Sequence, residues 1–303
     1  MPASQNPSPQ DVPASSHVIL PPPTVNSILD STLPVGLRMP TGDRVRTVEF
    51  HEHTAEDLTV LRDTSIIRKS PITFMMRLIA LGVEKIGGEA VYEEFKKSGF
   101  KQVPKLLEGL AITDAEYLIV AAHIHSYGGV TEGDWECPSC GEMQLARFDL
   151  TQMQVTKFPE GPEEHRPVVT VELERGITFD TIEAFPQFQQ TEWKFYTMEM
   201  PTMSRLLQVE KVTGKRREKF DPKVLARSAV QISAGNGVVM PQDMKSMLGD
   251  DIILKLKARD MISLGKFVFD YLPRLDRELR VTCENCGVEA GEGLDPTMLL
   301  PGG

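Results

Sequence analysis

Two short cysteine motifs constrain this chain more than any other feature of its sequence. Cys137–Gly141 and Cys283–Gly287 both read Cys-x-x-Cys-Gly, and they hold all four cysteines of the 303 residues. Two residues between a pair of thiolates let both sulfur atoms reach one ion from a tight turn. The glycine suits a positive φ, which turns backbone N–H groups toward the sulfur atoms. Two such turns complete a closed, tetrahedral zinc site with no position left for water or substrate.

The predicted ligands of one structural Zn²⁺ are Cys137, Cys140, Cys283 and Cys286. The two pairs are nearly half the chain apart, far more than the about 15–20 residues of an ordinary zinc ribbon. Two arrangements fit this spacing. Either the pairs meet across the fold on a single zinc, or each pair lies on its own hairpin and is completed by another group or left without metal. We favour the shared site, because zinc needs four ligands and the sequence offers four cysteines and little else.

Disulfide and redox roles for these cysteines are less favoured. The first residues contain neither the basic region nor the apolar region of a secretory signal peptide, so we expect synthesis in the cytoplasm. Thiols stay reduced in that compartment. Neither cysteine pair opens a helix in a β-α-β context, as a thioredoxin-like redox motif would.

The histidines do not form a convincing metal site in the sequence. His51 and His53 are two residues apart on the edge of a predicted strand and share a face, which favours a solvated pair over a metal site. His123 and His125 fall on different faces of a predicted helix, which argues against chelation.

The charge balance argues against several function classes. The chain has 33 Lys and Arg and 43 Asp and Glu, so its net charge is −10. It therefore lacks the overall positive charge that is typical of nucleic-acid-binding proteins. A basic cluster at Lys211, Lys215–Arg217 and Lys219 has no interleaved aromatic residues, which favours a solvated loop. No apolar run reaches the about 18 residues of a membrane span. No nucleophile–base or carboxylate pairing indicates an enzyme.

The composition predicts an arm, two similar units and a linker. Residues 1–25 contain seven prolines and are expected to form a flexible arm. Residues 158–167 are charged and proline-bearing, which is typical of a linker. Residues 26–157 and 168–303 each run from β-rich segments through helices to a cysteine knuckle. We therefore expect an α+β fold of two similar units, built from β-hairpins and short helices, whose Cys-x-x-Cys zinc knuckles share one zinc-ribbon-like site.

Local signals in the first unit are specific. Leu33–Phe50 is predicted to form a β-hairpin with turns at Pro-Val-Gly and Pro-Thr-Gly-Asp, and Arg44–Phe50 alternates as a strand does. Thr54 is placed to cap a helix. Helical spacing continues over Ile72–Ile86, and another helix is expected from Asp114.

The second unit is expected to follow the same plan. Val168–Phe179 and Thr191–Met200 are strand candidates. Asp221 is predicted to cap a helix over Pro222–Ile232, in which Pro222 takes the first helical position. A further helix is expected from Asp250. Matching this aspartate to Asp114 predicts a weak internal repeat.

Three segments together carry a family resemblance: the hairpin and acidic helix start of Leu33–Leu58, the helix and cysteine hairpin of Ile112–Val155, and Cys283–Pro301, which repeats the second more loosely. In this combination the chain resembles the T-even-type phage baseplate hub assembly family of contractile-tailed phages and related injection systems. The resemblance implies that the four cysteines bind zinc and that there are no catalytic residues.

The resemblance further implies a non-enzymatic structural or assembly component of a contractile-tail baseplate hub. Its partners would be other hub, tube or wedge proteins, with no small-molecule substrate, no membrane insertion and no nucleic acid expected. It would be made in the cytoplasm and incorporated into a virion or injection-system particle. The alternative is a zinc-ribbon adaptor that binds nucleic acid or another protein. Acidic residues flank both knuckles, however: Glu136, Glu142, Glu284 and Glu289.

Overall fold

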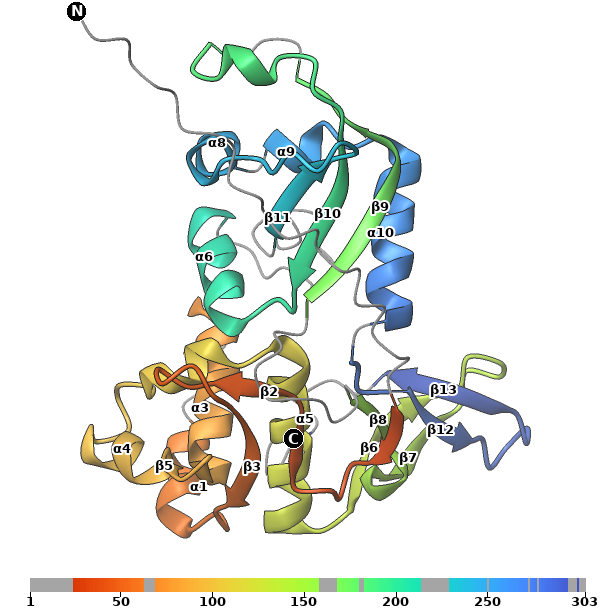
Figure 1. The fold of residues 1–303 in the computed structure, drawn as a ribbon. Helices are drawn as coiled ribbons and strands as arrows, with labels where there is room; N and C mark the ends of the chain where they lie inside the picture. Colours follow the sequence, from red (N-terminus) through yellow and green to blue (C-terminus); the bar gives the residue numbers. More distant parts are fainter. Residues whose placement is uncertain are drawn as a thin grey trace, which may run out of the picture.

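Two hydrophobic cores organise the computed structural model of this protein (Figure 1). The structure describes residues 24–62, 69–157, 168–179, 183–213, 229–249, 251–271, 273–276, 278–293 and 299. The described chain contains both helices and strands, in short runs of each, which confirms the predicted α+β content.

In the described residues, antiparallel strands and helices enclose the first core. The strands β2 (Thr32–Arg38), β3 (Arg44–Phe50), β4 (Val83–Ile86) and β5 (Glu89–Ala90) form one sheet in that order, and β1 (Thr24–Ser27) pairs with β8 (Gln154–Lys157). The helices are α1 (Ala55–Leu61), α3 (Pro71–Gly82), α4 (Tyr92–Lys97) and α5 (Ile112–Tyr127), with 3₁₀ turns η1 (Lys105–Gly109) and η2 (Leu150–Gln152).

Helix α5 lies at the centre of this core. Its residues from Ile112 to His123 are all buried, including the polar or charged Thr113, Asp114, Glu116 and His123. It ends at Gly128, whose φ of 91° is accessible to glycine. Helix α3 packs against it so closely that a Cβ placed on Gly82 would lie 2.4 Å from the Cβ of Ala122.

The second core lies under a three-stranded antiparallel sheet in the order β11-β10-β9. These strands are β9 (Val168–Ile177), β10 (Trp193–Glu199) and β11 (Ala229–Ala234), and the buried Trp193, Tyr196 and Ile232 fill its centre. Helix α10 packs along β9 (Figure 1). The helical elements in this part of the chain are η3 (Pro186–Phe188), α6 (Met203–Thr213), α8 (Gln242–Leu248), α9 (Asp251–Leu254) and α10 (Ala258–Tyr271). Helix α6 differs from the others because its Met203 and Leu206 are buried in the first core.

Two β-ribbons carry the cysteine motifs. The first is β6 (Val130–Glu136) with β7 (Met143–Asp149), and the second is β12 (Glu278–Thr282) with β13 (Glu289–Gly293). Figure 1 shows the second ribbon beside the first, away from the β9–β11 sheet. Leu279 and Val281 of β12 are buried in the first core. The chain therefore returns, after its second sheet, to the part built from its first half.

Several local predictions are confirmed. Arg44–Phe50 is a strand, and the predicted strands near 168–179 and 191–200 are β9 and β10. Thr54 caps α1, where its side chain and that of Asp57 each bond the other's backbone N–H in a capping box. The capping geometry follows from neighbouring residues alone, which is why the sequence revealed it.

Other local predictions are wrong because long-range pairing overrides local pattern. The Pro-Val-Gly turn lies inside β2, and the helix over Ile72–Ile86 ends at Gly82 since the next four residues form β4 on β3. The end of the helix predicted over Pro222–Ile232 is strand β11, paired with β10. The helix predicted from Asp250 is divided into α9 and α10.

Some predictions concern residues outside the described part of the chain. These are the helix cap at Asp221, the residue Asp250 itself, the linker over 158–167 and the basic residues 215–219. Of the predicted arm over residues 1–25, only the last two are described, and they begin β1.

Candidate metal centre

The four predicted ligands converge on one point. The Sγ atoms of Cys137, Cys140, Cys283 and Cys286 all lie within 4.8 Å of one another. Two contacts cross between the ribbons at 3.7 Å, from Cys137 Sγ to Cys286 Sγ and from Cys140 Sγ to Cys283 Sγ. A disulfide would need a separation of about 2.05 Å. Four Zn–S bonds of about 2.3 Å place tetrahedral sulfur atoms about 3.8 Å apart, which the cross-ribbon contacts match.

The two knuckles have the same backbone geometry. In each, the first cysteine is buried and the second is exposed. Gly141 and Gly287 have φ values of 72° and 71°, the conformation for which their glycines were predicted. The backbone hydrogen bonds also correspond, and each is 2.9 Å long. In the first knuckle, the N–H of Cys137 donates to the carbonyl of Glu142 and that of Gly141 to the carbonyl of Cys137. In the second, the N–H of Cys283 donates to the carbonyl of Val288 and that of Gly287 to the carbonyl of Cys283.

A side-chain amide fastens the two ribbons to each other. Gln144 Nε2 donates to the carbonyl of Thr282 at 3.3 Å, while Gln144 Oε1 accepts from the backbone N–H of Glu284 at 3.0 Å. Asn285 Nδ2 lies 3.7 Å from Cys140 Sγ. The ribbons are thus held in register by protein groups beside the sulfur atoms.

The electrostatics of the cluster favour a bound cation. Backbone N–H groups of Cys140 and then Ser139 lower the pKa of Cys137 to about 7. The N–H of Val288 acts in the same direction on Cys286, but burial and the three neighbouring thiols outweigh it and raise its pKa to about 11. The thiol of Cys137 therefore ionises more readily than the thiol of Cys286 beside it. A divalent cation among the four sulfur atoms would offset the repulsion between neighbouring thiolates. Thiolates are also ligands that zinc prefers.

A buried aspartate precedes each ribbon in an equivalent place. Asp114, the third residue of α5, accepts from the backbone N–H groups of Val35 at 2.7 Å and Gly36 at 3.0 Å. Asp260, the third residue of α10, accepts from the N–H of Arg175 at 3.1 Å, and Gly176 follows. Both glycines have positive φ, 94° and 65°.

The structural counterpart of Asp114 is therefore Asp260 and not Asp250, to which the sequence comparison matched it. A spacing signal was present in the sequence, since Asp114 precedes Cys137 by as many residues as Asp260 precedes Cys283. Burial raises the pKa of Asp114 to about 7, although the N–H groups of Val35 and Gly36 act against it.

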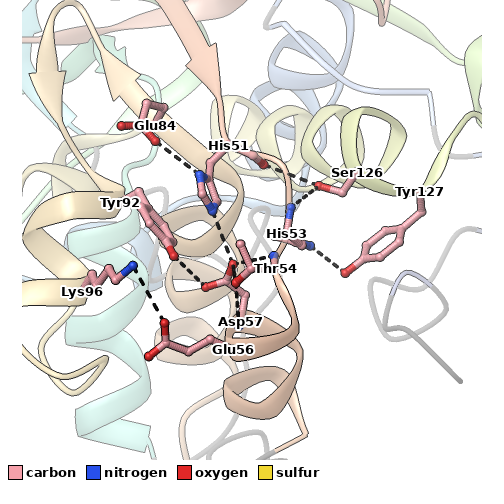
Figure 2. Close-up of polar contacts among 10 residues, drawn as sticks. All are labelled: His51, His53, Thr54, Glu56, Asp57, Glu84, Tyr92, Lys96, Ser126 and Tyr127. Carbon is pink, nitrogen blue, oxygen red and sulfur yellow. Dashed lines mark hydrogen bonds and ion pairs between the residues drawn. The ribbon is translucent and has the colours of Figure 1, made fainter.

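His51 corrects the prediction of a solvated histidine pair. Its Nε2 lies 3.3 Å from Asp57 Oδ2 and its Nδ1 lies 3.3 Å from Glu84 Oε2. Its ring stacks on Tyr92 at 3.6 Å between centroids, and Tyr92 Oη donates to Asp57 Oδ1 at 3.0 Å. Figure 2 shows these side chains converging from the residue that follows β3 and from α1, β4 and α4. The cluster joins four elements of the first core.

His53 takes a different set of contacts. Its Nδ1 lies 2.7 Å from Tyr127 Oη, and its backbone N–H donates to Ser126 Oγ at 3.2 Å (Figure 2). Burial lowers the pKa of His53 to about 4, so the ring is neutral at pH 7. Among the described residues, the four cysteines are the group of potential metal ligands whose ligand atoms all lie within 4.8 Å of one another.

One of three comparisons with known proteins gave a match. The family model described as T4 bacteriophage base plate protein matches residues 88–295, a span that includes both cysteine ribbons. Searches of curated proteins and of solved structures gave no significant match. Among the described residues, none of the helices has the length and apolar character needed to cross a membrane. Because the family model covers more than half of its residues, the chain belongs to the T4 bacteriophage base plate protein family.

Proposed function

We propose that this protein is a non-enzymatic structural or assembly component of a contractile-tail baseplate hub, stabilised by one structural Zn²⁺. The observation that carries the proposal is the convergence of four cysteine Sγ atoms from two ribbons far apart in the sequence of a baseplate-family chain. All four positions around the ion are filled by protein atoms, so the zinc has no site for substrate or reactive water.

The zinc joins the C-terminal ribbon to the first core. That ribbon is short and buries only a few apolar side chains, among them Leu279 and Val281. A structural zinc in a small domain supplies an apparent binding free energy of about 10–16 kcal/mol at neutral pH. Such a contribution is ample to hold two strands that local packing alone would leave marginal.

The two units form an internal repeat arranged around the metal. Residues 26–157 and 168–303 make up the units, joined by the linker 158–167. Support comes from the equivalent knuckles and from the equivalent carboxylates of Asp114 and Asp260. The Sγ contacts are reciprocal as well, because the first cysteine of each pair faces the second of the other. This is the pattern of a local two-fold axis through the site.

The protein acts through contacts with other baseplate hub, tube or wedge proteins, after synthesis in the cytoplasm and incorporation into the particle. Exposed carboxylates surround the knuckles, which disfavours a nucleic-acid partner since phosphate would be repelled there.

Elemental analysis and native mass spectrometry of the purified chain test the zinc. One zinc per chain is expected, lost in both Cys137→Ser and Cys283→Ser and kept in Ser139→Ala, a change within the same knuckle that removes no ligand. A folded wild-type protein without metal, whose four thiols react freely, would refute the site. Loss of metal in only one of the two serine variants would refute sharing between the ribbons.

Complementation tests the role in assembly. A particle lacking this chain is expected to show no complete baseplates by electron microscopy, and the wild-type chain is expected to restore them. Normal baseplates without the chain would contradict the proposal.

A further inference from the structure

The outer face of the first cysteine ribbon exposes large apolar side chains. Along β6 and β7 the inward residues Trp135, Ala146 and Phe148 are buried in the first core. The outward residues Met143 and Leu145 are 58% and 61% exposed. Side chains two apart on a strand lie on the same face, so these two form one apolar surface.

Carboxylates border this surface. In the ribbon register Met143 lies opposite Glu136, and Leu145 lies opposite Asp134. Further along, Glu132 is paired with Arg147 at 3.1 Å, but Asp134 and Glu136 make no ion pair with any described residue. The outer face is therefore apolar in the middle and negatively charged on its β6 side.

The second ribbon provides an internal comparison. Counted from the first cysteine of each pair, Glu289 and Gly291 occupy the places of Met143 and Leu145. Arg280 forms an ion pair with Glu289 at 3.3 Å, so the same face there is polar and partly neutralised. Since this ribbon folds with glutamate and glycine at those places, the knuckle does not require apolar residues on its outer face.

We propose that the outer face of the first ribbon, formed by Asp134, Glu136, Met143 and Leu145, is a docking surface for another protein. The surface fits a partner whose apolar side chains are flanked by lysine or arginine, because only such a partner both buries the two apolar residues and neutralises the unpaired carboxylates. Methionine suits this role, since its flexible side chain adapts to a partner and is enriched in interface cores. The inference rests on the proposed function, in which such a partner is a neighbouring baseplate protein.

A double variant of the surface tests this inference. Met143→Gln keeps the length of the side chain and Leu145→Thr introduces a residue that favours strands, while together they remove the apolar character. Leu254→Gln with Ile262→Gln is the matched control, because those residues are 74% and 69% exposed on α9 and α10. Each full-length chain is titrated against the purified hub, tube and wedge proteins of its own particle, with zinc content measured in parallel.

The expected result is that one of these proteins binds the wild type and the control alike, and binds the surface variant about tenfold or more weakly. Glu136→Gln is expected to weaken the same complex, and rising salt should weaken it for the wild type more than for Glu136→Gln.

Two results overturn the docking surface and leave the proposed function intact. These are equal binding of the wild type and the surface variant, and a surface variant that loses only self-association, which would assign the face to a second copy. If the zinc-loaded wild type binds none of the three proteins, the docking surface and the proposed hub role fail together.

Discussion

The Sγ atoms of Cys137 and Cys286 lie 3.7 Å apart although almost half the chain separates the two residues. The reciprocal contact between Cys140 and Cys283 has the same length. The proposed metal site therefore closes a loop that contains the whole second sheet, and removing the metal has a structural consequence that is specific to one part of the molecule.

Zinc removal is expected to loosen the β12–β13 ribbon before the β9–β11 sheet. The ribbon is held by the proposed metal, the Gln144 bridge and a few buried side chains such as Leu279 and Val281, whereas the sheet has its own core around Trp193. Hydrogen–deuterium exchange with and without a chelator measures this difference. The wild type kept in zinc is the control, and equal loss of protection in both regions would contradict the expectation.

Asp114→Asn is expected to lower the free energy of unfolding by about 1–3 kcal/mol. An asparagine offers only one acceptor oxygen, so the N–H of Val35 or Gly36 loses its partner in a buried place. Urea denaturation measures the change. Asp260→Asn is the matched comparison and should cost less, because Asp260 accepts one bond from the described backbone where Asp114 accepts two.

Burial raises the pKa of Asp114 to about 7, which predicts that the effect of Asp114→Asn on the free energy of unfolding depends on pH. The unfolded carboxyl ionises near its ordinary value of about 3.9, so between about pH 4 and 7 the folded state binds more protons than the unfolded state. The contribution of Asp114 to stability consequently falls as pH rises through this range and is constant above it. The difference in unfolding free energy between wild type and Asp114→Asn should therefore be larger at pH 5 than at pH 8. A difference that grows with pH would show that the folded pKa is not raised.

Asp57→Ala is expected to cost about 1–3 kcal/mol of folding stability. Burial would raise the pKa of Asp57, but bonds from Thr54, Tyr92 and His51 outweigh it and hold the pKa below its usual value. This stabilisation is complete above the ordinary pKa of an aspartate and is lost as pH falls through the lowered folded value.

Thermal unfolding from pH 7 down to pH 3 measures this dependence on Asp57. Tyr92→Phe, which removes one of the bonds to the carboxylate, should give a smaller loss at pH 7 and keep the acid dependence. An Asp57→Ala protein as stable as the wild type at pH 7 would contradict the role of the cluster.

Gly82→Ala is expected to destabilise the fold by about 1–3 kcal/mol through overpacking. The added methyl group would lie 2.4 Å from the Cβ of Ala122, and the two helix backbones would have to separate. Gly235→Ala is the control, since the nearest atom there is Cδ of Lys194, 3.9 Å away in a flexible side chain. Denaturation midpoints compare the two, and equal effects would argue against close α3–α5 packing.

The sequence by itself determined what depends on neighbouring residues. The Cys-x-x-Cys-Gly spacing predicted both knuckles, and Thr54 with Asp57 set the start of α1. Alternating residues predicted β3, and the strand candidates Val168–Phe179 and Thr191–Met200 correspond to β9 and β10. These features were readable because their hydrogen bonds and side-chain periods close within a few residues.

Only the tertiary structure decided the relationships that pair distant segments. It placed Val83–Ile86 and Ala229–Ala234 in sheets, although their local pattern continues a helix, because neighbouring strands supply their hydrogen bonds. It brought His51 between two carboxylates and buried Asp114 against the backbone of β2. It also placed the second ribbon against the first core, so that the two cysteine pairs face each other. The sequence alone was compatible with either separate sites or a shared site. That meeting depends on how the intervening sheet packs, which no local spacing encodes.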